Sequence, residues 1–255
     1  MLTRAVIVFL TLSTVAAIAQ TSSTPPVFDV ASVKPSRRLA GPDYNNHLSY
    51  TPAGITARNA TLKRLLAEAY HLQLAQILGP SWLDKNEYDI DARSAVAGTR
   101  AEHALMLRSL LAQRFQLTEH SDVREMRVYN LVISKSGPKI RSTNDEEGHS
   151  AGDGFHFHGD MRQFADLLAI QLSIPASDNP YEPARASVSP TPVLDKTGLQ
   201  GIFDFSVDLR PELGTDMFAS WQRVLDDQLG LKIVNSKGKV SVLVVDEAAR
   251  IPTEN

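Results

Sequence analysis

The chain has 255 residues and no cysteine, and its 26 Lys and Arg residues against 29 Asp and Glu residues give a formal net charge of −3. This balance offers no broad basic surface, which argues against nucleic acid and anionic lipid as partners. Without cysteine there is no disulfide and no thiolate chemistry, so an ordinary hydrophobic core must hold the fold together.

The first 19 residues have the pattern of a secretory signal peptide. Arg4 supplies a positive charge, residues 5–12 are largely apolar, and the last three read Ala-Ile-Ala, which is the small-x-small pattern before a cleavage site. The apolar run is shorter than the roughly 20 residues of a transmembrane helix, and no later stretch is apolar enough to cross a bilayer. We therefore predict cleavage near Ala19, a disordered leader over residues 20–26, and a mature protein that is periplasmic or secreted. An uncleaved membrane anchor is the alternative.

The segment after the leader alternates strands with helices. Apolar side chains stand at mostly alternate positions in residues 27–33, 54–57 and 88–92, which predicts strands. In residues 61–70 and 100–114 they recur at helical spacing, which predicts two amphipathic helices. A hairpin is expected next.

In that hairpin, residues 115–120 pair with residues 127–134 across a turn near residues 121–125. Residues 142–153 are polar and contain glycine, and we interpret them as a linker. After the linker, helices are predicted over residues 160–172 and 215–229. Between these helices lie a Pro- and Ser-rich insertion, residues 175–192, and a strand, residues 203–208. The chain closes with strands at residues 231–234 and 240–245 joined by a turn at Lys237-Gly238.

The second half of the chain repeats the plan of the first. Residues 54–57, which lead into the first helix, correspond to residues 154–157, which lead into the helix at 160–172. Residues 110–117 likewise correspond to residues 224–231, and a strand follows each. Such internal symmetry indicates duplicated units. We therefore predict two repeated halves, residues 27–141 and 154–255, joined by the linker at 142–153.

The predicted fold class is mixed α/β, because each half interleaves two helices with several strands in a layered arrangement. The segment from Met161 to the strand at Phe203 is also similar to the small β-α-β modules at the N-termini of secretins and TonB-dependent receptors. That similarity concerns the fold and carries no function.

A set of motifs spread over most of the mature chain resembles a large family of soil-associated bacterial proteins of unknown function. The motifs lie at residues 28–35, 80–84, 110–115, 128–132, 135–139, 193–199, 201–205 and 228–232. The resemblance implies a secreted protein whose domain is fused in some relatives to membrane-bound, sensor-type metallopeptidases. It implies no established activity and supplies no catalytic residue.

The sharpest candidate for chemistry is the pair His156 and His158. Residues two apart on a strand project to the same side, so both imidazoles can reach one transition-metal ion, with Asp153 or Asp160 as a further ligand. The alternative is a pair of solvent-facing histidines on a strand beside a polar loop. No other cofactor is indicated.

Three aromatic residues form a second candidate site. Trp82 follows the predicted turn at Gly79-Pro80 and lies near Tyr70 and Tyr88 in the sequence. The three rings can therefore form the floor of a ligand groove. The alternative is that Trp82 packs a helix against the sheet, which is the commoner role of a tryptophan beside a proline turn.

The common catalytic signatures, such as Gly-x-Ser-x-Gly and His-Glu-x-x-His, are missing from the sequence. The leading hypothesis is a non-catalytic secreted or periplasmic module that binds a small ligand or a protein partner of the cell envelope. One alternative is a metal-dependent hydrolase that uses His156 and His158. Another is a structural envelope component that self-associates. The sequence leaves the oligomeric state open.

Overall fold

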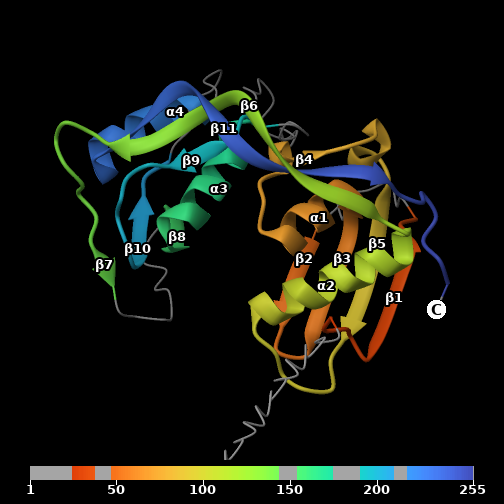
Figure 1. Ribbon diagram of the computed structural model, residues 1–255. Coiled ribbons are helices and arrows are strands. Elements are labelled where there is room, and N and C mark those ends of the chain that lie inside the picture. The colour runs from red at the N-terminus through yellow and green to blue at the C-terminus, as the bar shows by residue number, and fades with distance from the viewer. Residues whose placement is uncertain (1–24, 38–46, 144–153, 175–189, 210–216, 255) are drawn as a thin grey trace, which may run out of the picture.

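The computed structural model describes residues 25–37, 47–143, 154–174, 190–209 and 217–254. These residues form four α-helices and three sheets in two lobes (Figure 1), and the mixed α/β fold class is confirmed. The predicted signal peptide lies outside the described residues. So does most of the predicted leader, of the linker and of the insertion at residues 175–192.

The first lobe is a four-stranded antiparallel sheet with two helices on one face (Figure 1). Its strands, in the order β1-β5-β3-β2, are β1 (Val30–Pro35), β5 (Glu87–Arg93), β3 (Gly54–Thr61) and β2 (His47–Thr51). The helices are α1 (Leu62–Tyr70) and α2 (Arg100–Phe115). Both helices and the strand at residues 88–92 are confirmed.

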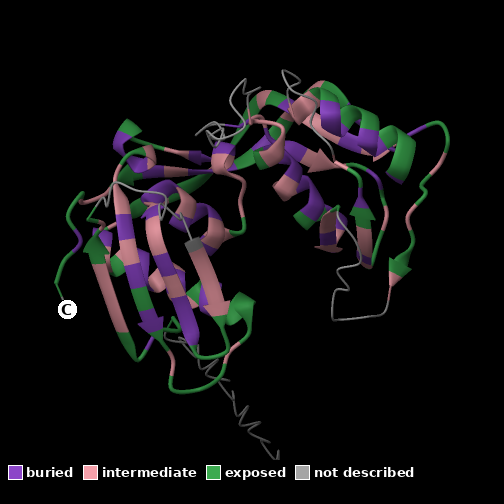
Figure 2. Cartoon of the chain, turned by 180° about the vertical axis from the view of Figure 1, so that it is seen from behind, coloured by how far each residue is buried: buried purple, intermediate pink, exposed green. Residues whose placement is uncertain are grey.

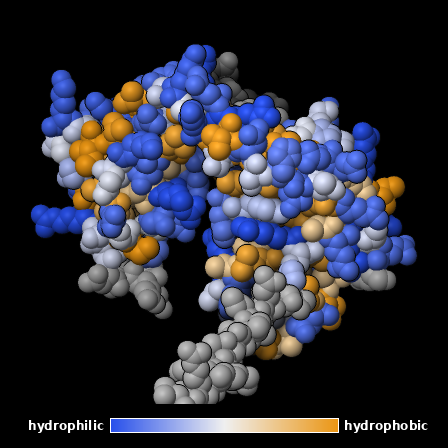
Figure 3. Space-filling view, in the orientation of Figure 1, coloured by the Kyte–Doolittle hydropathy of each residue, from blue (hydrophilic) through white to orange (hydrophobic). Residues whose placement is uncertain are grey.

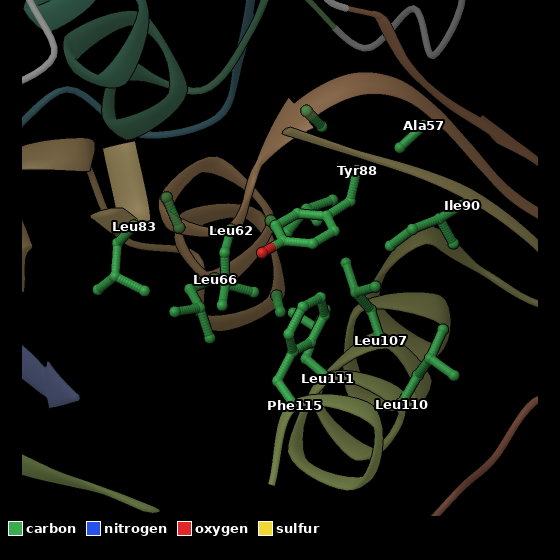
Figure 4. Close-up of a cluster of buried hydrophobic side chains, with 14 of the residues drawn as sticks. Ala57, Leu62, Leu66, Leu83, Tyr88, Ile90, Leu107, Leu110, Leu111 and Phe115 are labelled. Atoms are coloured by element: carbon green, nitrogen blue, oxygen red, sulfur yellow. The ribbon is translucent and has the colours of Figure 1, made fainter. Parts of the chain in front are cut away.

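The core of this lobe fills the space between the helices and the sheet (Figure 4). Tyr88 of β5 points from the sheet toward the helices, and its ring meets Phe115 of α2 edge-on with 4.8 Å between the centroids. Leucines at helical spacing surround the two rings, namely Leu62 and Leu66 of α1 and Leu107, Leu110 and Leu111 of α2. The amphipathic pattern of the sequence therefore forms this core.

Side chains at the N-termini fix where the helices begin. The Thr61 hydroxyl accepts the Arg64 N–H before α1. Thr99 forms a reciprocal capping box with Glu102 before α2. In the second lobe, Asp160 and Gln163 form the same box before α3 (Met161–Gln171). Each cap satisfies backbone N–H groups that the first helical turn leaves without partners.

The second lobe has a smaller sheet and two helices. The sheet order is β7-β10-β8, with β7 (Ser142–Thr143), β10 (Ile202–Val207) and β8 (Phe155–Gly159). Beside α3 lies α4 (Met217–Val224), which continues into a π-helical turn (Leu225–Leu229). The predicted strand at residues 203–208 and the helix at 160–172 are confirmed. The helix at 215–229 is confirmed from residue 217 onward, with a π-helical end.

Aromatic side chains dominate the core of the second lobe. The Trp221 ring of α4 meets Phe155 of β8 and Phe164 of α3 edge-on, with centroids 5.2 and 5.9 Å away. Phe164 also packs against Phe157 and Phe205. Edge-on aromatic pairs stabilise a core beyond their buried area.

Two long antiparallel strands join the lobes. They are β6 (Thr118–Ile133) and β11 (Leu231–Glu247), and they pair along their whole length (Figure 1). We call this pair the ribbon. Two short parallel strands, β4 (Ile77–Leu78) and β9 (Val193–Asp195), flank it. Two 3₁₀ turns, Leu74–Gln76 and Ser81–Asp84, precede and follow β4.

Both predicted hairpins are wrong. The predicted turns at residues 121–125 and at Lys237-Gly238 lie inside β6 and β11, where Glu125 stands opposite Lys239. The middle of the ribbon crosses between the lobes, and no residue in 121–127 or 234–239 is buried. An exposed ribbon carries polar side chains while its backbone keeps the ladder bonds. Its sequence therefore resembles that of a turn.

The ribbon supplies residues to both cores. At one end, Leu243 and Val245 of β11 are buried in the core of the first lobe. At the other end, Leu131 of β6 and Leu231 of β11 are buried in the core of the second. Figure 2 shows buried residues gathered within each lobe. The predicted internal repeat is not shown by this arrangement, since one lobe has four sheet strands and the other three.

Among the described residues, no helix combines the length and the apolar character that a membrane span requires.

Gly230 ends the π-helical turn with φ at 67°, and a Cβ there would overlap the carbonyl oxygen of Gly137. Gly198 has a similar φ of 70° but open space around the position of a Cβ. We expect Gly198→Ala to lower the free energy of unfolding by about 1 kcal/mol through backbone strain alone. Gly230→Ala adds overpacking, so we expect it to cost about 1–3 kcal/mol more. Urea denaturation of both variants measures the difference, and equal costs would contradict the predicted overlap.

Candidate functional site

A cleft of about 770 Å³ lies between the two lobes. Its walls come from α1, from the loop that follows α1, from the start of α2, and from α3. In the space-filling view the surface is hollowed between the lobes, with hydrophilic side chains on both sides (Figure 3). A volume of this size is typical of small-molecule sites.

The wall on the first lobe is the polar side of α1. Because Leu62, Leu65 and Leu66 are buried in the core, the residues at complementary helical positions face away from it. Arg64 and Glu68 are such residues, and both line the cleft. They are joined there by His71 and Leu72, which follow the helix, and by Arg100 and Ala101 at the start of α2.

The wall on the second lobe is one stripe of α3. Phe164 and Leu168 are buried, whereas Arg162, Asp166 and Ile170 recur at intervals of four residues and line the cleft. Side chains four apart on a helix lie one above the other. The cleft is therefore bounded by two helical stripes that carry charged residues, and Ile170 at the end of the α3 stripe is 41% exposed.

Two ion pairs lie in these walls. The Arg100 guanidinium binds the Glu68 carboxylate, with 3.2 Å from Nε to Oε1, and also lies over the Tyr50 ring. On α3, the Arg162 guanidinium donates to the Asp166 carboxylate at 3.0 Å. Within the described ranges, no carboxylate lies within salt-bridge distance of Arg64.

Two groups in the cleft have shifted pKa values. Burial raises the pKa of the Asp166 carboxyl above its ordinary value, against the opposing effects of a hydrogen bond from Gln73 and the charge of Arg162. Burial lowers the pKa of the His71 imidazole below its ordinary value, against the opposing effect of the Glu68 carboxylate. The His71 imidazole therefore carries a proton less often at pH 7 than an ordinary histidine does.

The Gln73 side chain ties the lobes together at the base of the cleft. Its Nε2 donates to the Asp166 carboxylate at 2.8 Å and to the Val193 carbonyl at 2.6 Å. Its Oε1 accepts the Val193 N–H at 2.9 Å. The amide thus pairs with the backbone of β9 as another strand would, and it fixes the start of that strand against the loop after α1.

The structure brings the two predicted metal ligands together with a third group. His156 and His158 share one face of β8, and Asp204 of the neighbouring strand β10 lies between them. The distances are 3.4 Å from His156 Nε2 to Asp204 Oδ1 and 3.6 Å from His158 Nδ1 to Asp204 Oδ2. The other nitrogen of His156 lies 3.2 Å from the Ser206 hydroxyl, and His158 also lines the cleft.

The carboxylate here is Asp204 rather than the predicted Asp153 or Asp160. Asp160 caps α3 through the N–H of Gln163, and Asp153 lies outside the described residues. Over the described ranges, no group of three or more His, Cys, Asp or Glu residues is arranged to hold a metal ion. An ion at His156 and His158 would therefore require these side chains to shift.

The three aromatic residues of the other candidate site belong to the first lobe. Tyr88 and Trp82 are buried in its core, 1% and 9% exposed, and the Tyr88 hydroxyl donates to the Arg250 carbonyl at 2.7 Å. Tyr70 is half-buried, and its hydroxyl donates to Glu119 at 2.7 Å. These contacts favour the packing alternative, and a ligand groove at these rings stays a prediction.

The cleft could not be predicted from the sequence. Its lining residues come from α1, α2 and α3, which are distant in the chain, and their only local signal is a basic residue four positions from an acidic one. Such pairs are ordinary on exposed helices. The relative placement of the lobes, which the long ribbon sets, is what makes these residues a site.

The Asp166 pKa leads to a stability prediction. Because the folded-state pKa is raised, the folded protein binds more protons than the unfolded chain at pH values between the two pKa values, so stability falls there as pH rises. We expect Asp166→Asn to remove this loss. Urea denaturation gives the free energy of unfolding of the unsubstituted protein and of Asp166→Asn from pH 7 to pH 4. As pH falls, the unsubstituted protein should gain stability relative to the variant. An unchanging difference would contradict the prediction, and the exposed Asp226→Asn is the control.

One comparison with known proteins gives a match. The model of the family described as "Protein of unknown function (DUF3738)" matches residues 63–248, from α1 to the end of the ribbon. No curated protein and no solved structure matches the chain significantly. The match covers well over half of the chain and includes every described residue that lines the cleft, whereas β1, β2 and β3 of the first lobe precede it. The chain belongs to this family of proteins of unknown function.

Proposed function

We propose that the mature protein is a non-catalytic binding module of the cell envelope, periplasmic or secreted, and that it holds a small ligand in the cleft between its lobes. The cleft is the observation that carries this proposal. The signal-peptide pattern of residues 1–19 supports the location.

The construction of the cleft supports binding. Each wall includes a helix whose opposite face is anchored in a hydrophobic core, so many of the lining side chains project from rigid elements. The lining mixes apolar side chains, such as Leu74 and Leu167, with charged groups such as Arg64. Small-molecule sites commonly combine an apolar lining with a few oriented polar groups.

The test is a panel of small molecules against the protein from Gln20 to Asn255. The panel contains amino acids, dipeptides, monosaccharides and carboxylic acids, and the readout is the shift in Tm. A ligand at about 100 times its Kd stabilises the folded state by roughly 2.7 kcal/mol, which is a shift of several degrees for a chain of this size. We expect one class of compound to give such a shift.

Matched variants locate the binding. Ala101 lines the cleft and is exposed, so Ala101→Trp fills the cleft without disturbing a core. Ala219→Trp adds the same bulk on an exposed position of α4. Binding should be lost in the first variant and retained in the second. Binding that survives Ala101→Trp, or a panel without any binder, would contradict the proposal. N-terminal sequencing of the exported protein tests the location.

A second candidate is a metal-dependent hydrolase that uses His156, His158 and Asp204, whose side chains lie together but would have to shift to hold an ion. Two ligands of a tetrahedral zinc ion lie about 3.4 Å apart, because each is about 2.1 Å from the ion. The two nitrogen–oxygen distances of the cluster, 3.4 and 3.6 Å, are close to this separation. An ion with three protein ligands keeps a position for water, which is the arrangement of hydrolytic zinc sites.

The metal content of tag-free protein, measured by inductively coupled plasma mass spectrometry after incubation with Zn²⁺ and desalting, tests this candidate. It predicts about one equivalent of metal, which is lost when His156 and His158 are both replaced by Ala. His120→Ala is the control, since His120 is an exposed histidine that pairs with Asp246 instead. Metal-free protein, or metal retained in the double variant, would remove the hydrolase from consideration.

A further inference from the structure

The charges that line the cleft do not balance. Among the residues that the structure describes, three arginines and two carboxylates line it. Arg100 pairs with Glu68, and Arg162 pairs with Asp166. Arg64 is left over, and it has no carboxylate partner among the described residues. A cleft with this composition carries one uncompensated positive charge and favours an anion.

The cleft also has an apolar surface that no part of the described chain fills. Leu72 and Leu74 line it from the loop after α1, and Leu167 and Ile170 line it from α3. Ile170 is 41% exposed although Phe164 and Leu168 of the same helix are buried. Covering such side chains with an apolar group is favourable at about 25 cal/mol per Å².

We propose that the cleft binds a small amphiphile with one negative charge. Its anionic head group pairs with the Arg64 guanidinium, and its apolar body lies along Leu74, Leu167 and Ile170. The inference rests on the proposed function and names the ligand class for the same site. A guanidinium presents a fork of N–H donors that matches the two oxygens of a carboxylate or a phosphate.

The paired arginines help to select this class. Arg100 and Arg162 are already engaged by Glu68 and Asp166, so a second negative charge on the ligand would meet two carboxylates in place of free guanidinium groups. A cationic head group would face Arg64, and no carboxylate of the described cleft lining is free to accept it. A monoanion is therefore the charge state that the walls accommodate best.

The test compares two probes of equal chain length and opposite charge by isothermal titration calorimetry. Decanoate carries the expected head group, and decyltrimethylammonium carries the wrong one, both below their micelle concentrations. We expect one equivalent of decanoate to bind, and decyltrimethylammonium to bind at least tenfold more weakly. Acetate, which is the head group without the chain, should bind at least tenfold more weakly as well.

Substitutions of arginine assign the head-group contact. We expect Arg64→Gln to weaken decanoate binding at least tenfold and to abolish the preference for the anion. Arg64→Lys, which keeps the charge but loses the fork, should retain part of the affinity. Arg127→Gln, on the exposed middle of the ribbon, should change nothing. Circular dichroism confirms that each variant is folded.

The outcomes separate this inference from the proposed function. Equal binding of the two decyl probes, no binding of decanoate, or an unchanged affinity in Arg64→Gln would overturn the inference. If an uncharged compound of the panel then binds and loses its binding in Ala101→Trp, the proposed function stands without the anionic ligand. If no compound loses its binding in Ala101→Trp, the proposed function fails too.

Discussion

The pairing of β6 with β11 is the constraint on which the rest of the structure depends. Each strand is longer than either lobe needs, and their register runs without interruption from Leu231 opposite Ile133 to Val245 opposite Glu119. The two ends of the ribbon are buried in different cores, and its middle is exposed. The backbone ladder therefore fixes the distance and direction between two cores that have their own sheets and helices.

The cleft is a consequence of that spacing. The ribbon holds the lobes at one edge, and the helices α1 and α3 face each other across the space beside it (Figure 1). Gln73 adds a second connection by binding both Asp166 and the backbone of Val193. The bond to Asp166 involves a partly buried carboxylate, so it is stronger than a hydrogen bond between neutral groups. The polar walls are thus held apart at a separation that suits a small molecule.

Helix positions could be predicted from the sequence because their causes are local. The spacing of Leu62, Leu65 and Leu66 and the capping residues Thr99 and Asp160 act within one or two turns of the chain. The long strands β6 and β11 could not be predicted in this way, because they form by pairing with residues far away in the chain. The polar residues at 121–125 resemble a turn until they are paired with residues more than a hundred positions away.

The candidate sites also combine features that the local sequence predicts with features that depend on distant parts of the chain. The shared face of His156 and His158 follows from strand periodicity, so the sequence could predict that the imidazoles lie together. Asp204 completes the cluster through the register of β8 and β10, and register is not readable from either strand alone. The cleft residues carry even less local signal, since an Arg-Asp pair such as Arg162 and Asp166 is common on any exposed helix.

The ribbon also decides what one lobe can do without the other. The first core contains Leu243 and Val245, which come from the last strand of the chain, so a protein that ends after residue 141 would lack part of that core. Large buried side chains such as leucine each contribute about 2–5 kcal/mol, while a whole domain is stable by about 5–15 kcal/mol. Loss of the β11 strand would therefore remove a large part of the stability of the first lobe. Both cores share the strand β11, so a ligand that contacts both walls of the cleft stabilises the arrangement that this strand holds together.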